Sequence, residues 1–152
     1  MDVDLGEMIK DCRFIGMQLS SRGSKALSDQ GLTPIQARVL LYILKHSERG
    51  TSLTEIHRET GYTMAATSGL IKRLRENGYI LMGDDNRITL TEQGEAIARR
   101  IWERHNLLTS FFIRLGVSES VARADACKIE HDISDETFDK IKAHIGKHTS
   151  CE

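Results

Sequence analysis

The chain contains little of what all-β folds and secreted proteins depend on. Only one of its 152 residues is proline, and aromatic residues make up 5%. Because strand-rich sandwiches and barrels are enriched in aromatic residues and turn-forming prolines, this composition favours a mainly helical chain. The three cysteines, Cys12, Cys127 and Cys151, are odd in number and far apart. That pattern indicates a reducing compartment rather than a disulfide scaffold.

A long hydrophobic run and a strong net charge are also absent. No apolar stretch approaches the roughly 18–20 residues that a membrane span requires. The N-terminus, MDVDLGEMIKD, is acidic where a secretory signal would be basic. We therefore expect a cytoplasmic protein that does not enter a membrane. The formal net charge of −1 leaves a nucleic-acid partner open, because only the local distribution of charge could decide that.

Hydrophobic periodicity divides the chain into helices and one hairpin. Thr33 followed by Pro34 is a favourable helix start. Over residues 79–90 the period changes from helical to alternating, and two short strands flank an Asp-Asn turn. Helical spacing predicts seven helices, at residues 4–22, 34–46, 52–60, 63–77, 92–115, 119–131 and 135–147.

This order of elements predicts a mainly α-helical fold with a small β-hairpin wing. The helices at 52–60 and 63–77 form a helix-turn-helix through Gly61, and the hairpin that follows is the wing. We predict two domains. Residues 1–90 form an N-terminal helix and a winged helix-turn-helix, and residues 91–152 form a helical domain.

A winged helix can lay its second helix in the major groove of DNA while the wing reaches the neighbouring backbone or minor groove. Hydroxyl side chains near the helix start can contact phosphates or base edges, and later cations can neutralise phosphates. The predicted DNA contacts are Thr63, Ala66, Thr67 or Ser68, Lys72, Arg73, Arg75 and, after the wing tip, Arg87. The inner face of this helix is expected to carry Met64, Leu70, Ile71, Leu74 and either Thr67 or Ser68.

The charges near this surface are also open to a simpler interpretation. Each of the three cations on helix 63–77 could belong to a solvated helix face. Asp84 and Asp85 at the wing tip would repel phosphate. The prediction of DNA binding therefore depends on the order of elements rather than on charge.

A cluster of potential metal ligands lies in the last third of the chain. Cys127, Glu130 and His131 stand at i, i+3 and i+4, so their side chains leave one face of a helix. The short connection at residues 116–118 predicts an antiparallel helical hairpin, which brings His105 to nearly the height of Cys127. These ligands suit Fe(II), Mn(II), Co(II) or Zn(II) better than Mg²⁺ or Ca²⁺. Spacing alone also permits a structural role in the helical core.

Two stretches resemble known families of transcription regulators. Residues 32–80, from LTPIQARVLLYILKH to LRENGYI, resemble the winged-helix core of MarR-type regulators. RHNLLTSFFIRLGV and ADACKIEHDISDET are similar to the dimerisation and metal-binding region of the DtxR/MntR family of metal-dependent repressors. That resemblance covers residues 34–147 with the winged helix included, and it makes 91–152 a dimerisation and metal-binding domain. It implies a homodimer that represses metal-uptake genes from a palindromic operator in double-stranded DNA.

The DtxR/MntR resemblance also implies a ligand set. Metal ligands of the family match His105, Cys127, Glu130 and His131, with one divalent transition metal per subunit. A cysteine at position 127 resembles the iron-responsive branch, whereas the manganese-responsive branch has a carboxylate there. Fe(II) is therefore the first expectation and Mn(II) the second.

The family draws a further ligand from the first helix of its winged unit, and here this chain departs from the pattern. Alignment on Tyr42 places Gln36, a weak and neutral ligand, at that position. Asp4, Glu7 or Met8 on the N-terminal helix could substitute for it. The positions of the family's ancillary metal site hold Thr109 and Arg123, so no second metal is expected. The sequence also stops before the SH3-like domain that some members carry, so none is expected.

Two other functions remain open from the sequence. Gln36 and the MarR-like front half fit a MarR-type regulator that responds to a small organic ligand, or to an oxidant through Cys12 or Cys127. A small metalloenzyme could use the same cluster, but no accompanying nucleophile, oxyanion arrangement or substrate-binding loop is visible. We therefore predict a regulator without enzymatic activity, in which metal favours the DNA-binding conformation of the dimer.

Overall fold

The structure is a computed structural model that describes residues 4–6, 9, 32–130 and 132–149. Its helices and strands, in chain order, are α2 (Pro34–Lys45), α3 (Leu53–Thr60), α4 (Met64–Glu76), β1 (Ile80–Met82), β2 (Ile88–Leu90), α5 (Glu92–Arg114), α6 (Glu119–Ile129) and α7 (Asp135–Thr149). This order confirms the mainly α-helical fold with a β-hairpin wing. Most of the N-terminal helix predicted at 4–22 lies outside the described residues, as do Met8 and His131.

Helices α3 and α4 form the predicted helix-turn-helix, and side chains at their ends define them. The Ser52 hydroxyl accepts the Glu55 backbone N–H, and the Thr63 hydroxyl accepts that of Ala66, both at 3.2 Å. These bonds satisfy donors that are otherwise free in the first turn of each helix. Gly61 ends α3 at a φ of 70°, a left-handed conformation that favours glycine. The chain therefore turns sharply from α3 into α4.

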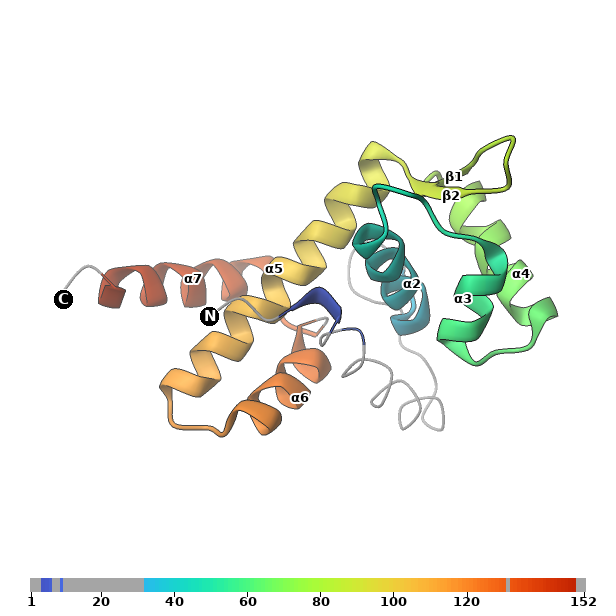
Figure 1. The fold of residues 1–152 in the computed structure, drawn as a ribbon. Helices are drawn as coiled ribbons and strands as arrows, with labels where there is room; N and C mark the ends of the chain where they lie inside the picture. The colour runs from blue at the N-terminus through green and yellow to red at the C-terminus, as the bar shows by residue number, and fades with distance from the viewer. Residues whose placement is uncertain (1–3, 7–8, 10–31, 131, 150–152) are drawn as a thin grey trace.

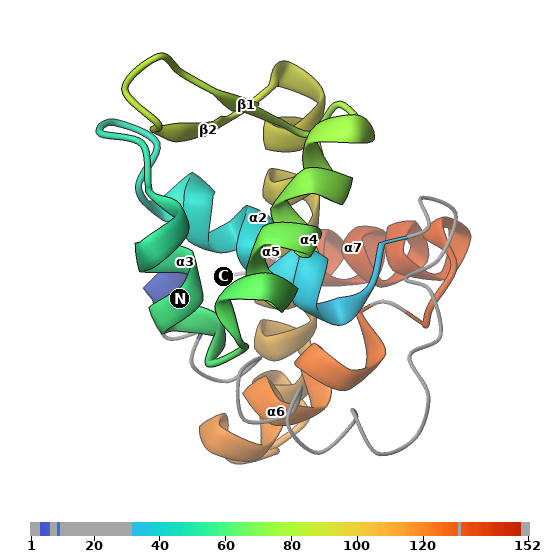
Figure 2. The same cartoon turned by 90° about the vertical axis from the view of Figure 1, so that its right-hand side faces the viewer.

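The wing is a two-stranded antiparallel hairpin. Ile80 of β1 lies opposite Leu90 of β2, and Met82 lies opposite Ile88. Thr51, just before α3, exchanges two backbone hydrogen bonds with Ile88, at 3.0 and 2.7 Å. The hairpin is therefore joined to the helix-turn-helix as well as closed on itself. Figure 2 shows it at the end of the winged part that lies away from α6.

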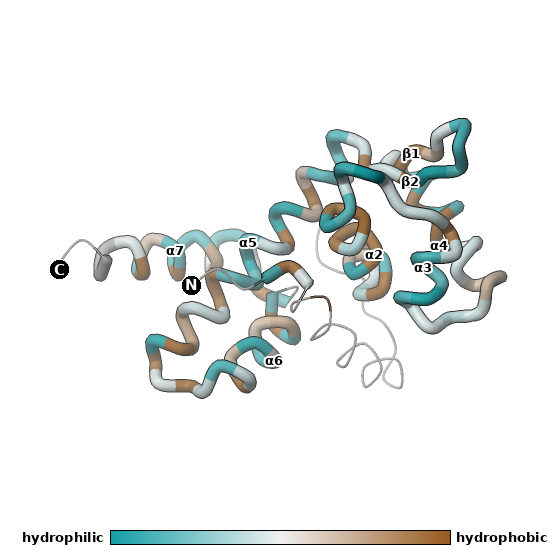
Figure 3. Tube along the Cα trace, in the orientation of Figure 1, coloured by the Kyte–Doolittle hydropathy of each residue, from teal (hydrophilic) through white to brown (hydrophobic). Residues whose placement is uncertain are grey.

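The main hydrophobic core lies inside the winged part. Leu40, Ile43, Ile56, Leu74 and Ile88 are fully buried, and they come from α2, α3, α4 and β2. Figure 3 shows hydrophobic residues concentrated on α2. Burial of one such side chain stabilises a fold by about 1.5–3 kcal/mol. This core therefore holds the helix-turn-helix and the wing together as one unit.

Helix α5 connects the winged part to α6 and α7 (Figure 1). At its start, the Thr91 hydroxyl accepts the Gly94 backbone N–H at 3.0 Å and donates to the Gly78 carbonyl at 2.6 Å. The Thr91 backbone N–H donates to the Tyr79 carbonyl at 3.0 Å. The first turn of α5 is therefore tied to the segment between α4 and the wing.

The far end of α5 forms a hairpin with α6, as predicted. Gly116 reverses the chain at a φ of 94°, and α6 packs back along α5 with Ala122 and Ala126 fully buried. Helix α6 ends at Ile129, two residues before its predicted end, and Glu130 is its C-cap. Figure 1 shows α7 extending to the side of α5 that faces away from the winged part. Among the described residues, no helix is both long enough and apolar enough to cross a membrane.

Candidate metal centre and nucleic-acid interface

The hairpin of α5 and α6 brings two predicted ligands into direct contact. His105 lies on α5 and is 0% exposed, and the Glu130 side chain at the end of α6 is 1% exposed. The distance from His105 Nδ1 to Glu130 Oε2 is 2.8 Å. When Glu130 is ionised it can only accept, so Nδ1 carries the hydrogen and donates it. This contact confirms the pairing of helices on which the predicted cluster depends.

The other nitrogen of His105 fits a metal ligand. Nε2 is buried and has no hydrogen-bond partner among the residues that the structure describes. With the hydrogen on Nδ1, the Nε2 lone pair is free, and a carboxylate on the opposite nitrogen fixes the tautomer and orientation of the ring. Metal-ligating histidines usually have such a partner. The donors present therefore fit a divalent transition metal at this nitrogen.

The remaining predicted ligands are distributed around this pair. Cys127 lies one turn before Glu130 on α6, is 6% exposed and forms no disulfide. His131 and Met8 lie outside the described residues. Within the described part of the chain, no group of three or more histidine, cysteine, aspartate or glutamate side chains is arranged to hold a metal. The full ligand set therefore stays a prediction.

Gln36, the predicted ligand from the winged unit, has a structural role at the start of α2. Its side-chain oxygen accepts the Thr33 backbone N–H at 2.8 Å, and its own backbone N–H donates to the Thr33 hydroxyl at 3.4 Å. This reciprocal arrangement is a capping box, which glutamine at this position readily forms. A metal at Gln36 would have to share the oxygen with the cap or displace it, and coordination by Gln36 stays a prediction.

The exposed face of α4 carries most of the predicted DNA contacts. Thr63 caps the helix and is exposed at the turn that follows α3. The other predicted residues with exposed side chains on α4 are Ala66, Ser68, Lys72, Arg73 and Arg75. Lys72 Nζ lies 3.8 Å from Glu76 Oε1, an ion pair between two exposed side chains that is weak enough for a phosphate to replace it.

On α4 the structure decides the open choice between Thr67 and Ser68 and corrects the expectation for Met64. Thr67 is fully buried, and its hydroxyl donates to the Thr63 carbonyl at 2.9 Å. It has no exposed surface for a DNA contact, so Ser68 is the hydroxyl residue on the outer face. Met64, expected inside, is 42% exposed because it is the first residue of the helix and precedes the first inward-facing position.

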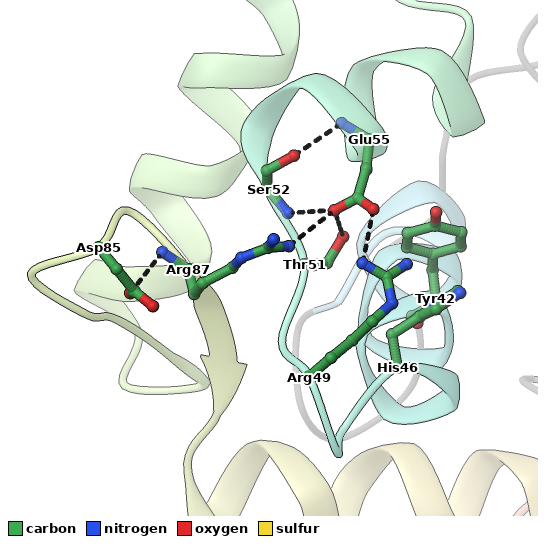
Figure 4. A network of polar contacts seen from close by, with 8 residues as sticks. All are labelled: Tyr42, His46, Arg49, Thr51, Ser52, Glu55, Asp85 and Arg87. Atoms are coloured by element: carbon green, nitrogen blue, oxygen red, sulfur yellow. Dashed lines mark hydrogen bonds and ion pairs between the residues drawn. The ribbon is translucent and has the colours of Figure 1, made fainter.

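Arg87, the predicted wing contact, belongs to a polar network that the sequence did not reveal (Figure 4). Its backbone N–H donates to Asp85 Oδ1 at 3.0 Å, and its Nη1 lies 3.5 Å from Glu55 Oε2. Arg49 Nη1 lies 2.7 Å from the other oxygen of Glu55. The Ser52 backbone N–H also donates to the Glu55 carboxylate, at 2.8 Å. Arg49 and Arg87 therefore flank one carboxylate beside the wing.

This network lowers the pKa of Glu55 to about 2. The largest cause is the hydrogen bond from Arg49, which stabilises the ionised form, and burial opposes it. The spacing Ser52-x-x-Glu55 before an apolar residue is a capping-box signal, so Glu55 could have been placed from the sequence. Its contacts with Arg49 and Arg87 could not, because they depend on how the wing packs against α3.

Comparison with known proteins identifies the family. The family model described as "Iron dependent repressor, metal binding and dimerisation domain" matches residues 91–152, and the MarR family model matches residues 30–85. An HTH-type transcriptional regulator of Methanocaldococcus jannaschii, described as uncharacterized, is 31% identical over 119 residues, covering 78% of this chain and 94% of that protein. The chain belongs to the DtxR/MntR family.

Other members of the DtxR/MntR family show the same relationship. The transcriptional regulator MntR of Salmonella typhimurium is 38% identical over 93 residues, which are 60% of this chain and 59% of that protein. A manganese-dependent transcriptional repressor in complex with manganese has a TM-score of 0.61 at 27% identity, covering 73% of this chain and 52% of that one. The chain therefore aligns with little more than half the length of these two proteins.

Family membership establishes the function at a coarse level. The chain is a metal-dependent transcriptional regulator from a family of dimeric DNA-binding proteins, and not an enzyme. The predicted DtxR/MntR-type assignment, with a MarR-like winged helix in the front half, is confirmed. The match to an iron-dependent repressor domain also makes a MarR-type sensor of organic ligands the weaker alternative. The division of the chain at residue 90 stays a prediction.

Proposed function

We propose that this chain is a homodimeric repressor of metal-uptake genes, which binds a palindromic operator when a divalent transition metal occupies a site between α5 and α6. The observation that carries the proposal is the buried His105–Glu130 pair, in which His105 Nε2 has no hydrogen-bond partner in the described part of the chain. A buried imidazole nitrogen without a partner is costly unless a ligand satisfies it.

The proposed ligands are His105 through Nε2, Cys127 and His131. Glu130, which the sequence predicts as a fourth ligand, contacts His105 Nδ1 and would have to leave that nitrogen to reach a metal at Nε2. Gln36 and Met8 are candidates for a further ligand from the front half. When bound, the metal would supply a positive charge that joins α5 to the end of α6 and stabilises the ionised thiol and carboxylate. The cysteine favours Fe(II), because thiolates suit softer ions than carboxylates do. Mn(II) is the second candidate, and the solved structure at 27% identity is a manganese-dependent repressor in complex with manganese.

Helix α5 offers a physical route from the metal site to DNA. His105 lies in its second half, whereas its first turn is bound to the segment between α4 and the wing through Thr91. A rigid helix fixed at both ends makes the position of α4 depend on the position of the α5–α6 hairpin. In a dimer, two recognition helices must lie about one DNA turn apart to enter successive major grooves. Metal would increase DNA affinity if it binds more tightly to the dimer conformation that has this spacing than to other conformations.

The proposed DNA surface combines the outer face of α4 with the wing. Thr63, Ala66 and Ser68 would approach base edges and phosphates near the helix start. Lys72, Arg73, Arg75 and Arg87 would neutralise phosphates on either side. Arg87 would exchange its contact with Glu55, at 3.5 Å, for a phosphate oxygen.

Metal stoichiometry tests the ligand set directly. We would dialyse the protein anaerobically against Fe(II) or Mn(II) and measure bound metal by elemental analysis. We expect about one ion per subunit in the wild type, and loss of most of it in Glu130→Ala. Glu136→Ala is the matched control, because Glu136 is exposed on α7. Equal metal content in the wild type and Glu130→Ala would exclude this site.

A further inference from the structure

A buried arginine lies directly beside the metal-site histidine. Arg104 precedes His105 on α5 and is 6% exposed, although arginine is rarely buried without partners. Its Nη2 donates to the Ile133 carbonyl at 2.5 Å, and its Nη1 donates to Asp135 Oδ1 at 2.8 Å. The guanidinium carbon lies 4.9 Å from the centre of the Phe138 ring, within cation–π distance. All three partners belong to the connection after α6 or to the start of α7.

Asp135 gives this attachment a second contact. Its carboxylate also pairs with Arg100, one turn before Arg104 on α5. The two guanidinium groups, Arg100 first, hold the pKa of Asp135 below its usual range. The Asp135 side chain is 54% exposed, so its substitution need not disturb the core. We call Arg100, Arg104 and Asp135, with the Ile133 carbonyl, the α5–α7 clamp.

The clamp closes the chain around the proposed metal site. On one side of Glu130, α6 is fixed by its packing along α5. On the other side, Ile133 lies three residues later and Asp135 five residues later, and both bind Arg104. Glu130 is therefore held against His105 from both directions, and the early end of α6 at Ile129 accompanies this attachment. A segment held in this way loses less conformational freedom when it binds a ligand.

We propose that Arg104 and Asp135 are positioning residues, which hold the end of α6 in the geometry for metal binding before metal arrives. This inference rests on the proposed metal site and adds a determinant of its affinity outside the ligands. Arg104 acts through the chain segment that carries Glu130 and does not itself contact metal. Supporting residues of this kind commonly change metal affinity by about 10–100-fold.

The test compares two sets of ion pairs that join α5 to α7. Asp135→Asn removes the charge that binds Arg100 and Arg104. Lys142→Gln removes the ion pair between Glu103 and Lys142 further along α7, away from the clamp. We would measure Mn(II) affinity anaerobically by competition with a fluorescent chelator, using the full chain. Affinity should fall about tenfold in Asp135→Asn and change less than about twofold in Lys142→Gln.

Hydrogen exchange of the metal-free protein provides a readout that needs no metal. Amides at residues 129–130 and 132–135 should exchange faster in Asp135→Asn than in the wild type, and at the wild-type rate in Lys142→Gln. Arg104→Lys is a second variant that keeps the charge but loses the planar donor pair, and it should resemble Asp135→Asn. Circular dichroism would verify that each variant remains folded.

The possible results separate this inference from the proposed function. In one outcome, the wild type binds metal and Glu130→Ala does not. If Asp135→Asn then has the same metal affinity and the same amide exchange rates as Lys142→Gln, the positioning role is wrong and the metal site is supported. If the wild type and Glu130→Ala take up equal amounts of metal, the proposed site is wrong, and the positioning role is overturned with it.

Discussion

Gly94 lies where α5 packs closely against the winged part. A Cβ atom added there would lie 1.9 Å from the Tyr79 carbonyl oxygen, far inside any van der Waals contact. The chain at Tyr79 could not retreat easily, because its carbonyl accepts the Thr91 N–H. Glycine is therefore required at this position because two backbone segments pack against each other, although glycine has a low helix propensity.

We predict that Gly94→Ala lowers the free energy of unfolding by about 2–3 kcal/mol, because the methyl group overlaps backbone. Urea unfolding followed by circular dichroism measures this. Gly146→Ala is the control on α7, where no atom of the residues that the structure describes lies within 4 Å of an added Cβ. That variant should gain about 0.5–1 kcal/mol from alanine's higher helix propensity. Equal effects of the two substitutions would contradict the close seating of α5.

The ionisation of Glu55 makes the stability of the folded protein depend on pH. Its folded-state pKa of about 2 lies below the ordinary value of 4.5, so it contributes stability that is present above about pH 4.5. That contribution is lost as the pH falls toward 2. Glu55→Gln keeps an oxygen for the Ser52 cap but loses the charge that binds Arg49.

We expect Glu55→Gln to be less stable than the wild type by about 0.5–1 kcal/mol at pH 7. The difference should shrink toward zero between pH 4.5 and pH 2, measured by urea unfolding at each pH. Glu48→Gln, at an exposed position just before Arg49, is the control and should show no such trend. A difference that persists unchanged at pH 2 would show that charge is not its cause.

At the scale of elements, α6 packs closely on α5 through small side chains. Ala122 and Ala126 lie one turn apart and are both fully buried. The same helix face carries Cys127 and leads to Glu130, so close packing of the helices is what brings the ligands near His105.

A larger side chain should therefore push the two helices apart. We expect Ala126→Leu to lower the free energy of unfolding by about 1–3 kcal/mol, because methylene groups are forced into a filled interface. Differential scanning calorimetry measures the change. Val121→Leu on the exposed side of α6 is the control, since Val121 is 48% exposed and should tolerate the extra group. A tolerated Ala126→Leu would mean that the interface is looser than described.

The sequence predicted the elements well because their ends are local signals. Thr33 with Pro34, Ser52, Gly61 and Gly116 mark helix starts, stops and turns within a few residues of chain. The end of α6 was predicted two residues too late, because the attachment of Ile133 to Arg104 joins residues 29 apart in the sequence. The choice between Thr67 and Ser68 likewise depended on the exact phase of α4, which packing against the core sets.

At the scale of the whole molecule, the long-range arrangement was less predictable. Helix rise and a short turn predicted that His105 lies at nearly the height of Cys127, and the observed 2.8 Å contact is with Glu130, one turn further along α6. The direction of α7, the clamp and the Arg49–Glu55–Arg87 network depend on contacts between distant segments. Periodicity and capping carry no information on such contacts, so they came only from the structure.

The phosphate contacts on α4 should appear in the salt dependence of DNA binding. We expect Lys72→Ala to reduce the slope of log affinity against log salt by about 1, since one fewer phosphate is neutralised. Fluorescence anisotropy at several salt concentrations gives the slope. Lys128→Ala on α6 is the control, because Lys128 is exposed but lies away from the winged part. An unchanged slope in Lys72→Ala would place the DNA elsewhere.

The measurement that most directly tests metal-dependent operator binding is anaerobic fluorescence anisotropy on DNA from upstream of the protein's own gene. Binding would be followed with chelator and then with Fe(II) or Mn(II) added separately, for the wild type, Glu130→Ala and the control Glu136→Ala. We predict that metal tightens binding by about tenfold or more in the wild type and the control. Glu130→Ala should show no gain. Tight binding in chelator that neither ion changes would contradict a metal switch and favour a MarR-type regulator with another signal.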